Sequence, residues 1–256
     1  MKRLSYSIAT IICCLLATSC EIDNFDGPNA GIQGTIYDHR GQPLQVGHGA
    51  TIIRIRDMSW AKGDTTLYTN NQRLRVQYDG TYRNTKLFSG DYLMLPDQGN
   101  FYPYDDTKRD ADDAGELVKI SGTTTKDFTV TPYVTIDWVQ KPRLTADGYI
   151  ECSFRFTRNQ KAGYGMPDIR DGLLKISRTL NNSSSDNVLF PARETMTNDM
   201  EGKEITWRTD IPVRYKGMDY YVRVLIACQA VAGDPTTNYP GLGLENCSTI
   251  EKIFVP

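Results

Sequence analysis

The sequence predicts an all-β protein built as two consecutive antiparallel β-sandwich domains. Almost no segment shows the 3.6-residue spacing of apolar side chains that an amphipathic helix needs. Short runs of alternating apolar and polar residues end instead at Gly, Pro, Asn or Asp, as strands bounded by turns do. These runs form two blocks of about 100 and about 125 residues, and each block has the usual size of a seven-strand sandwich.

The first block, residues 31–131, holds the strands of the amino-terminal sandwich. A turn is expected at 41–43, where proline fixes φ and glycine can take a positive φ. Asp79-Gly80 has the composition of a tight hairpin turn. The expected strands are 34–38, 50–56, 74–78, 81–84, 91–95, 117–120 and 126–130.

The second block, residues 132–256, holds the carboxy-terminal sandwich. Residues 149–156 alternate most clearly, so that the apolar side chains from Ile150 to Phe156 share one face of a strand. Residues 168–173 have the pattern of a short helix start. The other expected strands are 134–139, 172–177, 205–208, 219–227 and 249–255.

The amino terminus has the organisation of a secretory signal. Two basic residues precede an apolar run over 8–17, which is shorter than the about 20 residues that span a bilayer. Residues 16–20 read Leu-Ala-Thr-Ser-Cys and resemble the lipobox of bacterial lipoproteins, whose cysteine is acylated and becomes the first residue of the mature chain. Residues 1–19 are therefore expected to be a lipoprotein signal peptide and Cys20 the lipidation site. A plain signal peptide or a mitochondrial-type presequence is the alternative.

Residues 20–30 are expected to form an acidic tether. Glu21, Asp23 and Asp26 follow Cys20, and this stretch resembles the acidic export signal that directs lipoproteins of Bacteroidetes to the outer face of the outer membrane. An ordinary polar tether is the alternative. The expected location is the outer membrane, lipid-anchored and facing the cell exterior.

Cleavage of the signal changes the charge and the cysteine count. The formal charge moves from −2 to −4, because the signal carries two of the 29 basic side chains and no acidic one. This charge argues against a nucleic-acid partner. Cys152, Cys228 and Cys247 remain in the folded body. Buried free thiols and a Cys152–Cys228 bridge are equally compatible with the sequence.

Motifs for catalysis, cofactor binding or metal binding are missing from the sequence. The two histidines, His39 and His48, sit in or beside a turn, and no nucleophile motif or phosphate loop accompanies them. The acidic stretch 105–116 has Ala114 where an EF-hand would need a ligand, so a solvated loop is expected rather than a calcium site. We therefore expect a protein that is not an enzyme and that uses no cofactor or metal.

Aromatic residues in loops are the candidate ligand contacts. Trp60 lies in a stretch without strand alternation, and Tyr102 and Tyr104 lie beside Asp105 and Asp106. Sugar rings stack their C–H faces on indole and phenol rings, while carboxylates accept hydrogen bonds from their hydroxyl groups, and loops carry function more often than strands do. These five residues are the predicted ligand-binding set. Trp60 is equally compatible with closing one end of its sandwich.

Several stretches resemble a known family. Residues 34–38 with 41–44 resemble the opening of carboxypeptidase-regulatory-like sandwich domains, and residues 79–92 resemble a later signature of the same fold. Together with residues 20–26, they are similar to Bacteroidetes surface lipoproteins of the domain-of-unknown-function 3823 family. The resemblance is strongest over 20–92.

The resemblance implies a context more than a chemistry. It implies a transthyretin-like sandwich followed by an immunoglobulin-like one, found alongside SusC/SusD-like outer-membrane systems that import glycans or peptides. The expected function is a non-catalytic binding or accessory subunit of such an importer, with an oligosaccharide or peptide ligand. A structural or adhesive surface protein of the fimbrial type is the alternative. The family offers no catalytic residue to carry over.

Overall fold

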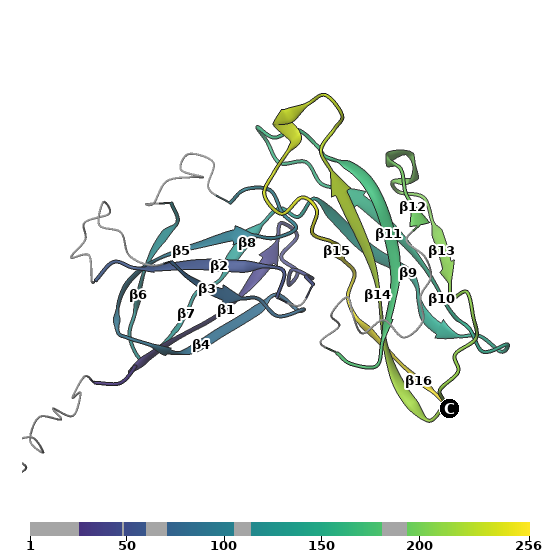
Figure 1. Ribbon diagram of the computed structural model, residues 1–256, viewed down its shortest axis with the longest axis horizontal. Helices are drawn as coiled ribbons and strands as arrows, with labels where there is room; N and C mark the ends of the chain where they lie inside the picture. Colours follow the sequence, from purple (N-terminus) through teal and green to yellow (C-terminus); the bar gives the residue numbers. More distant parts are fainter. Residues whose placement is uncertain (1–25, 48, 60–70, 105–113, 181–193) are drawn as a thin grey trace, which may run out of the picture.

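Two β-sandwiches lie side by side in the structure, a computed structural model that describes residues 26–47, 49–59, 71–104, 114–180 and 194–256. Strands β1 to β8 form the first sandwich and strands β9 to β16 the second (Figure 1). The predicted all-β fold class is therefore confirmed. Among the described residues, no helix is both long and apolar enough to cross a membrane.

The first sandwich consists of two four-stranded sheets. One sheet has the order β4-β1-β7, with β8 also paired to β1, and the other has the order β3-β2-β5-β6. The strands of the first sheet are β1 (Ala30–Asp38), β4 (Thr81–Leu87), β7 (Thr123–Thr125) and β8 (Phe128–Val130). Those of the second are β2 (Ile52–Asp57), β3 (Gln72–Arg75), β5 (Gly90–Gln98) and β6 (Glu116–Ile120).

Strand β1 departs from the purely antiparallel prediction. It pairs antiparallel with β4 but parallel with β7 and then with β8. Between β4 and β7 the chain forms two strands of the opposite sheet. No hairpin therefore joins β7 to β1, and the two strands are free to pair in parallel. Asp79-Gly80 likewise forms a turn, but it joins β3 and β4, which belong to different sheets.

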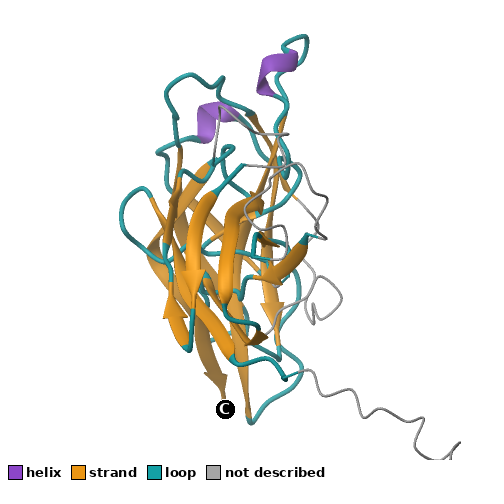
Figure 2. Cartoon of the chain, turned by 90° about the vertical axis from the view of Figure 1, so that its left-hand side faces the viewer, coloured by secondary structure: helices purple, strands orange, loops and turns teal. Residues whose placement is uncertain are grey.

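The second sandwich packs a three-stranded sheet against a five-stranded one. The orders are β13-β10-β9 and β12-β11-β14-β15, with β16 also paired to β14. The smaller sheet holds β9 (Val134–Leu144), β10 (Ile150–Arg158) and β13 (Ile205–Arg208). The larger sheet holds β11 (Asp168–Ser177), β12 (Glu194–Thr195), β14 (Met218–Gln229), β15 (Asn246–Cys247) and β16 (Glu251–Val255). Two short 3₁₀ helices, Asn198–Met200 and Pro235–Thr237, lie at the end opposite the carboxyl terminus (Figure 2).

Two sequence interpretations of the second sandwich have opposite outcomes. Ile150, Cys152, Phe154 and Phe156 are at most 1% exposed, so the predicted apolar face of β10 is confirmed. The helix start expected over 168–173 is wrong, because these residues begin β11, which pairs with β14 along its length. The cysteines Cys152, Cys228 and Cys247 are all free and buried, so the described chain has no Cys152–Cys228 bridge.

The segment after β5 joins the two sandwiches. Phe101 is 3% exposed and belongs to the first core, whereas the next residue, Tyr102, is 1% exposed and belongs to the second. Phe101 forms a bridge with Pro132, and the amide of Tyr133 donates to the carbonyl of Asn100. Two consecutive side chains thus enter two different hydrophobic cores.

Polar contacts also cross the boundary. The buried Arg223 of β14 donates from Nη1 to the carbonyl of Val46 in the first sandwich, at 3.0 Å. Arg40 of the first sandwich pairs at 3.1 Å with Asp137 of β9. The backbone of Gly241 approaches the carbonyl of Gly99 so closely that a Cβ there would lie 2.2 Å from that oxygen. The two sandwiches are therefore held by packing, hydrogen bonds and an ion pair.

Candidate functional site

Tyr102, predicted to contact a ligand, is a core residue. Its ring packs edge-on against Tyr133 and Tyr239, with centroid distances of 4.9 and 5.4 Å, and lies tilted against Tyr164 at 5.6 Å. Its hydroxyl donates to the carbonyl of Asn159 at 2.8 Å, and burial raises its pKa well above the usual value. The assignment of Tyr102 to a ligand site is therefore wrong, because tyrosines of the second sandwich cover it.

Tyr104 is half-buried and held by the first sandwich. Its ring packs edge-on against Phe128 at 5.6 Å, and its hydroxyl donates to the carboxylate of Glu116. Lys126 pairs with the same carboxylate at 2.5 Å. Burial opposes ionisation of Glu116, but hydrogen bonds from Lys126 and Tyr104 outweigh it, so the pKa of Glu116 lies below its usual value.

Four predicted site residues lie outside the described part of the chain: Trp60, Asp105, Asp106 and Cys20. Of the predicted ligand-binding residues, only Tyr102 and Tyr104 are described, and they pack against different cores. Trp138 and Trp207 are partly buried and pack against the second core. In the described segments, no group of three or more His, Cys, Asp or Glu side chains is placed to hold a metal ion.

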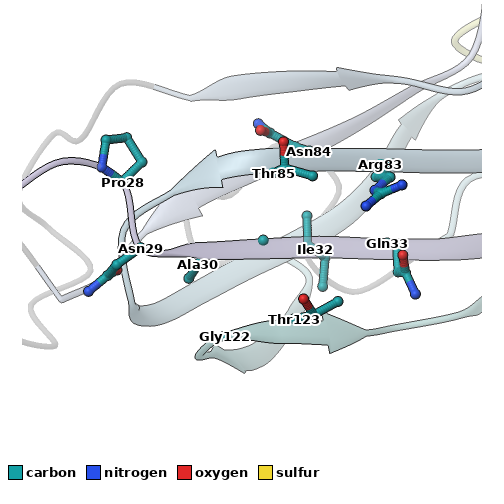
Figure 3. Close-up of a pocket in the computed structure, with 11 residues that line it drawn as sticks. Pro28, Asn29, Ala30, Ile32, Gln33, Arg83, Asn84, Thr85, Gly122 and Thr123 are labelled. Carbon is teal, nitrogen blue, oxygen red and sulfur yellow. The ribbon is translucent and has the colours of Figure 1, made fainter.

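A groove on the outer face of the β4-β1-β7 sheet is the candidate functional site. One hollow of about 310 Å³ lies over the start of β1, between Asn84 and Thr85 on one side and Gly122 and Thr123 on the other (Figure 3). A second hollow of about 490 Å³ continues along β1. Gln33 and Arg83 line both hollows, so the two hollows are adjacent, and together they are called the groove.

Alternation along the strands explains the polar lining of this groove. Ile32 and Ile36 of β1 point into the core, so Gln33, Thr35 and Tyr37 lie on the outer face. The pairing places Arg83 of β4 and Thr125 of β7 on either side of Gln33. The remaining polar residues that line it include Asn29, Thr81, Asn84, Thr85, Thr123 and Asp127.

Gly34 lies on the same inner face of β1 as Ile32 and Ile36 and marks a close approach of two backbones. A Cβ on this residue would lie 1.8 Å from the carbonyl of Lys126, so no other residue fits between β1 and the chain linking β7 to β8. At the same place the Asp127 carboxylate accepts a hydrogen bond from the amide of Thr35 at 2.7 Å, in the gap between the two parallel pairings.

The groove presents hydrogen-bond donors that the protein does not use. Among the described residues, the Arg83 guanidinium has no carboxylate within ion-pairing distance. Asn29 and Asn84 accept backbone hydrogen bonds through Oδ1, from Ser89 and Lys86 respectively, which leaves the Nδ2 donors to solvent. Together with the threonine hydroxyls, these groups suit a ligand rich in hydroxyl oxygens.

A smaller crevice lies between the two sandwiches, at the other end of β1. It has a volume of about 190 Å³ and is lined from the first sandwich by Asp38, Arg40 and Leu44 and from the second by Val134 and Asp137, among others. Asp38 accepts hydrogen bonds from the amides of Arg40 and Gln42, at 2.8 and 2.9 Å. Sequence reasoning missed the crevice and the groove, because both are formed by residues far apart in the chain.

The comparisons with known proteins identify the amino-terminal domain. Residues 30–131 match the family described as "Protein of unknown function (DUF3823) N-terminal domain". No curated protein matches the chain in sequence.

Several solved structures share the fold of nearly the whole chain. A DUF3823 family protein from Bacteroides uniformis is 21% identical, with a TM-score of 0.71, and one from Parabacteroides merdae is 18% identical, with a TM-score of 0.62. Another Bacteroides uniformis protein, described as a "putative carbohydrate binding protein", is 19% identical, with a TM-score of 0.66. The similarity covers 89–90% of this chain and 100% of each of these three. The resemblance noted in the sequence is thereby confirmed: the chain carries the amino-terminal domain of the DUF3823 family, and its two-sandwich fold is that of DUF3823 proteins.

Proposed function

We propose that this protein is a non-catalytic, lipid-anchored surface protein that binds an oligosaccharide in the groove along β1. The observation that carries the proposal is the continuous lining of amide, hydroxyl and guanidinium groups on the outer face of the β4-β1-β7 sheet. A sugar chain offers a row of hydroxyl groups, each able to donate and accept a hydrogen bond. The carbohydrate-binding description of one structural neighbour is consistent with this ligand class.

Arg83 and Gln33 are the central contacts of the proposed site. They face each other across the β1–β4 pair and line both hollows, so a sugar chain lying along the groove would pass over them. The guanidinium can donate two parallel hydrogen bonds to neighbouring hydroxyl oxygens. Tyr37, further along the same face, offers a ring for a sugar C–H face.

The anchoring part of the proposal rests on the sequence. Cys20 follows a basic, apolar and small-residue signal, and acidic residues follow it. A lipid at Cys20 would hold the groove near an outer-membrane importer of the SusC/SusD-like type and raise the local concentration of captured glycan. We infer binding rather than catalysis because the sequence has only two histidines and lacks a nucleophile motif.

Binding is tested by affinity electrophoresis and calorimetry against a panel of plant, host and bacterial polysaccharides and their oligosaccharides. We expect at least one glycan to bind, and we expect Arg83→Ala and Gln33→Ala each to weaken that binding about tenfold, which is the loss of one good hydrogen-bonded contact. Arg73→Ala is the matched control, since Arg73 is an exposed arginine on the other sheet, in β3. If no glycan binds, or if all three variants bind alike, the groove is not the site.

The anchor and the partner are tested in cells. Mass spectrometry of the mature protein should find acyl chains on an amino-terminal Cys20, and Cys20→Ala should release the protein from the outer membrane. Affinity purification of the lipidated protein should recover a SusC/SusD-like transporter. Recovery of the unmodified protein from membranes after Cys20→Ala would contradict the anchor, and repeated purification without any transporter would contradict the partner.

A further inference from the structure

Arg83 brings a positive charge without a counter-ion into the groove along β1. Among the described residues that line the first hollow, Arg83 carries the only charge. Its side chain is exposed and lies beside Gln33 (Figure 3). In the part of the chain that the structure describes, its guanidinium makes no hydrogen bond and no ion pair. Gln33 across the strand pair, and Thr81 and Thr85 on the same face of β4, are uncharged as well.

The amide side chains of the same hollow offer donors rather than acceptors. Asn29 Oδ1 accepts from the amide and the hydroxyl of Ser89, at 2.8 and 3.0 Å. Asn84 Oδ1 accepts from the amide of Lys86 at 2.8 Å. Both asparagines thus commit their acceptor oxygen to the protein and keep Nδ2 available, and the threonine hydroxyls of the hollow can also donate. The hollow is therefore suited to a ligand group that mainly accepts hydrogen bonds.

A carboxylate is the sugar substituent that matches this combination of donors and one cation. It accepts hydrogen bonds through two oxygens and donates none. The planar guanidinium of Arg83 can direct two parallel N–H groups at those two oxygens, and such a charge-assisted pair is stronger than a hydrogen bond to a hydroxyl. A uronic acid carries this carboxylate on a ring that keeps its other hydroxyl groups.

Asp127 limits where a second carboxylate of the ligand could lie. It lines the second hollow, accepts from the amide of Thr35 at 2.7 Å, and forms no ion pair with any described residue. Thr125 pairs with Gln33, so Asp127 lies two residues further on and on the other side of β1 from Arg83. The first hollow thus favours a negative charge, and the second hollow repels one.

We propose that the groove is specific for an acidic oligosaccharide, in which a single uronic acid pairs with Arg83 and neutral sugars lie over the second hollow. The inference rests on the proposed function, because it names the ligand class of the same site. The formal charge of the chain is −2, so the protein as a whole does not attract anions. Selectivity for the acid therefore comes from a short-range contact with one side chain.

The test is calorimetry with matched pairs of oligosaccharides. Each pair consists of a chain with one glucuronic, galacturonic or mannuronic acid and its carboxyl-reduced form, in which a CH₂OH group replaces the carboxylate. We expect at least one acid to bind about fivefold more tightly than its reduced form, which is the size of a well-aligned exposed ion pair. Added salt should reduce this preference.

The outcomes separate this inference from the proposed function. If every reduced form binds as tightly as its parent acid, the acid specificity is overturned and the groove remains a site for neutral glycans. If no glycan binds, acidic or neutral, both fail. A preference for chains with consecutive uronic acids over chains with one would overturn the limit set by Asp127.

Variants of Arg83 test whether the preference arises at this side chain. Arg83→Gln keeps a hydrogen-bonding amide but removes the charge, so the ratio of acid to neutral affinity should fall to about one, and Arg83→Lys should keep part of the preference. Arg73→Gln on β3 is the matched control and should leave the ratio unchanged. An unchanged ratio in Arg83→Gln would overturn the assignment.

A substitution of Asp127 tests the second hollow. Asp127→Asn removes the charge and keeps an oxygen that can accept from the amide of Thr35. This variant should bind an oligogalacturonate with consecutive acids more tightly than the wild type does, with no gain for the carboxyl-reduced chain. Equal affinity of the wild type and Asp127→Asn for the oligogalacturonate would show that Asp127 does not limit the ligand.

Discussion

Gly80 illustrates how one residue fixes the turn between β3 and β4. Its φ is +81°, and a Cβ would lie 2.8 Å from the carbonyl oxygens of both Ile36 and Leu44. Most residues avoid this backbone region, and here there is also no space for a side chain. The turn therefore requires glycine for two separate reasons.

Replacing Gly80 should test both reasons at once. Gly80→Ala is expected to lower the free energy of unfolding by about 2–4 kcal/mol, measured by urea denaturation, because strain and a backbone clash add. Gly41→Ala is the control, since Gly41 has a φ of +77° but no atom within 4 Å of the added Cβ. It should lose only about 1 kcal/mol. Equal losses would show that the clash at Gly80 relaxes.

Glu116 makes the stability of the first sandwich depend on pH. Folding lowers the pKa of Glu116 from its ordinary 4.5. The contribution of Glu116 to the free energy of unfolding is therefore complete above pH 4.5, and it is lost as the pH falls through the lower pKa of the folded state. The stability difference between the wild type and Glu116→Gln should therefore be largest at neutral pH and shrink on acidification below 4.5. Urea denaturation over this pH range measures it. Glu194→Gln, at an exposed glutamate on β12, is the matched control.

At the level of elements, the sequence predicts strands best where burial alternates with residue number. Strand β10 follows this pattern and was predicted almost to its ends. The helix start expected over 168–173 was wrong for a physical reason. Gly172 lies where Met196 and Trp207 pack against strand β11, and a Cβ there would be 2.4 Å from the methionine sulfur. Local sequence does not contain these neighbours. The short strands β7, β12 and β15 were missed for a related reason, since each exists only through its pairing partner.

The central position of β14 should make it the most stable element. It pairs with β11 on one edge and with β15 and β16 on the other, and its residues 222–228 are all buried. Hydrogen exchange followed by mass spectrometry should find the slowest amides there. Strand β6 provides the comparison, because it lies at a sheet edge and carries Leu117, which is 66% exposed. Faster exchange in β14 than in β6 would contradict this view of the sheet.

At the scale of the whole molecule, we expect the close contact between Gly241 and Gly99 to couple the unfolding of the two sandwiches. Gly241→Ala would place a Cβ 2.2 Å from the Gly99 carbonyl and force the boundary apart. We expect calorimetry to show one unfolding transition for the wild type and two for this variant, with the first at a lower temperature. Gly243→Ala is the control, because nothing lies within 4 Å of its added Cβ. A single unshifted transition in Gly241→Ala would show that the boundary adapts.

The candidate site was less predictable than the fold. The threonines and glutamine of the groove are ordinary residues for the solvent face of a strand, so the sequence does not mark them as a binding site. They are brought together only when β7 and β8 pair in parallel with β1. Tyr102 was predicted to contact a ligand because its local sequence is that of an exposed loop. In the structure it is covered by Tyr239 of the second sandwich. Both cases depend on contacts between residues distant in the chain.

The placement of Phe101 and Tyr102 in different cores also constrains the order of folding. During synthesis the first sandwich has all its strands once residue 130 has emerged, so Phe101 can be buried early. The pocket of Tyr102 is incomplete until Tyr239 arrives, near the end of the chain. Until then a large aromatic side chain stays exposed beside a finished domain. Docking of the second sandwich is thus the last folding step, and the newly made protein is most prone to aggregate just before it.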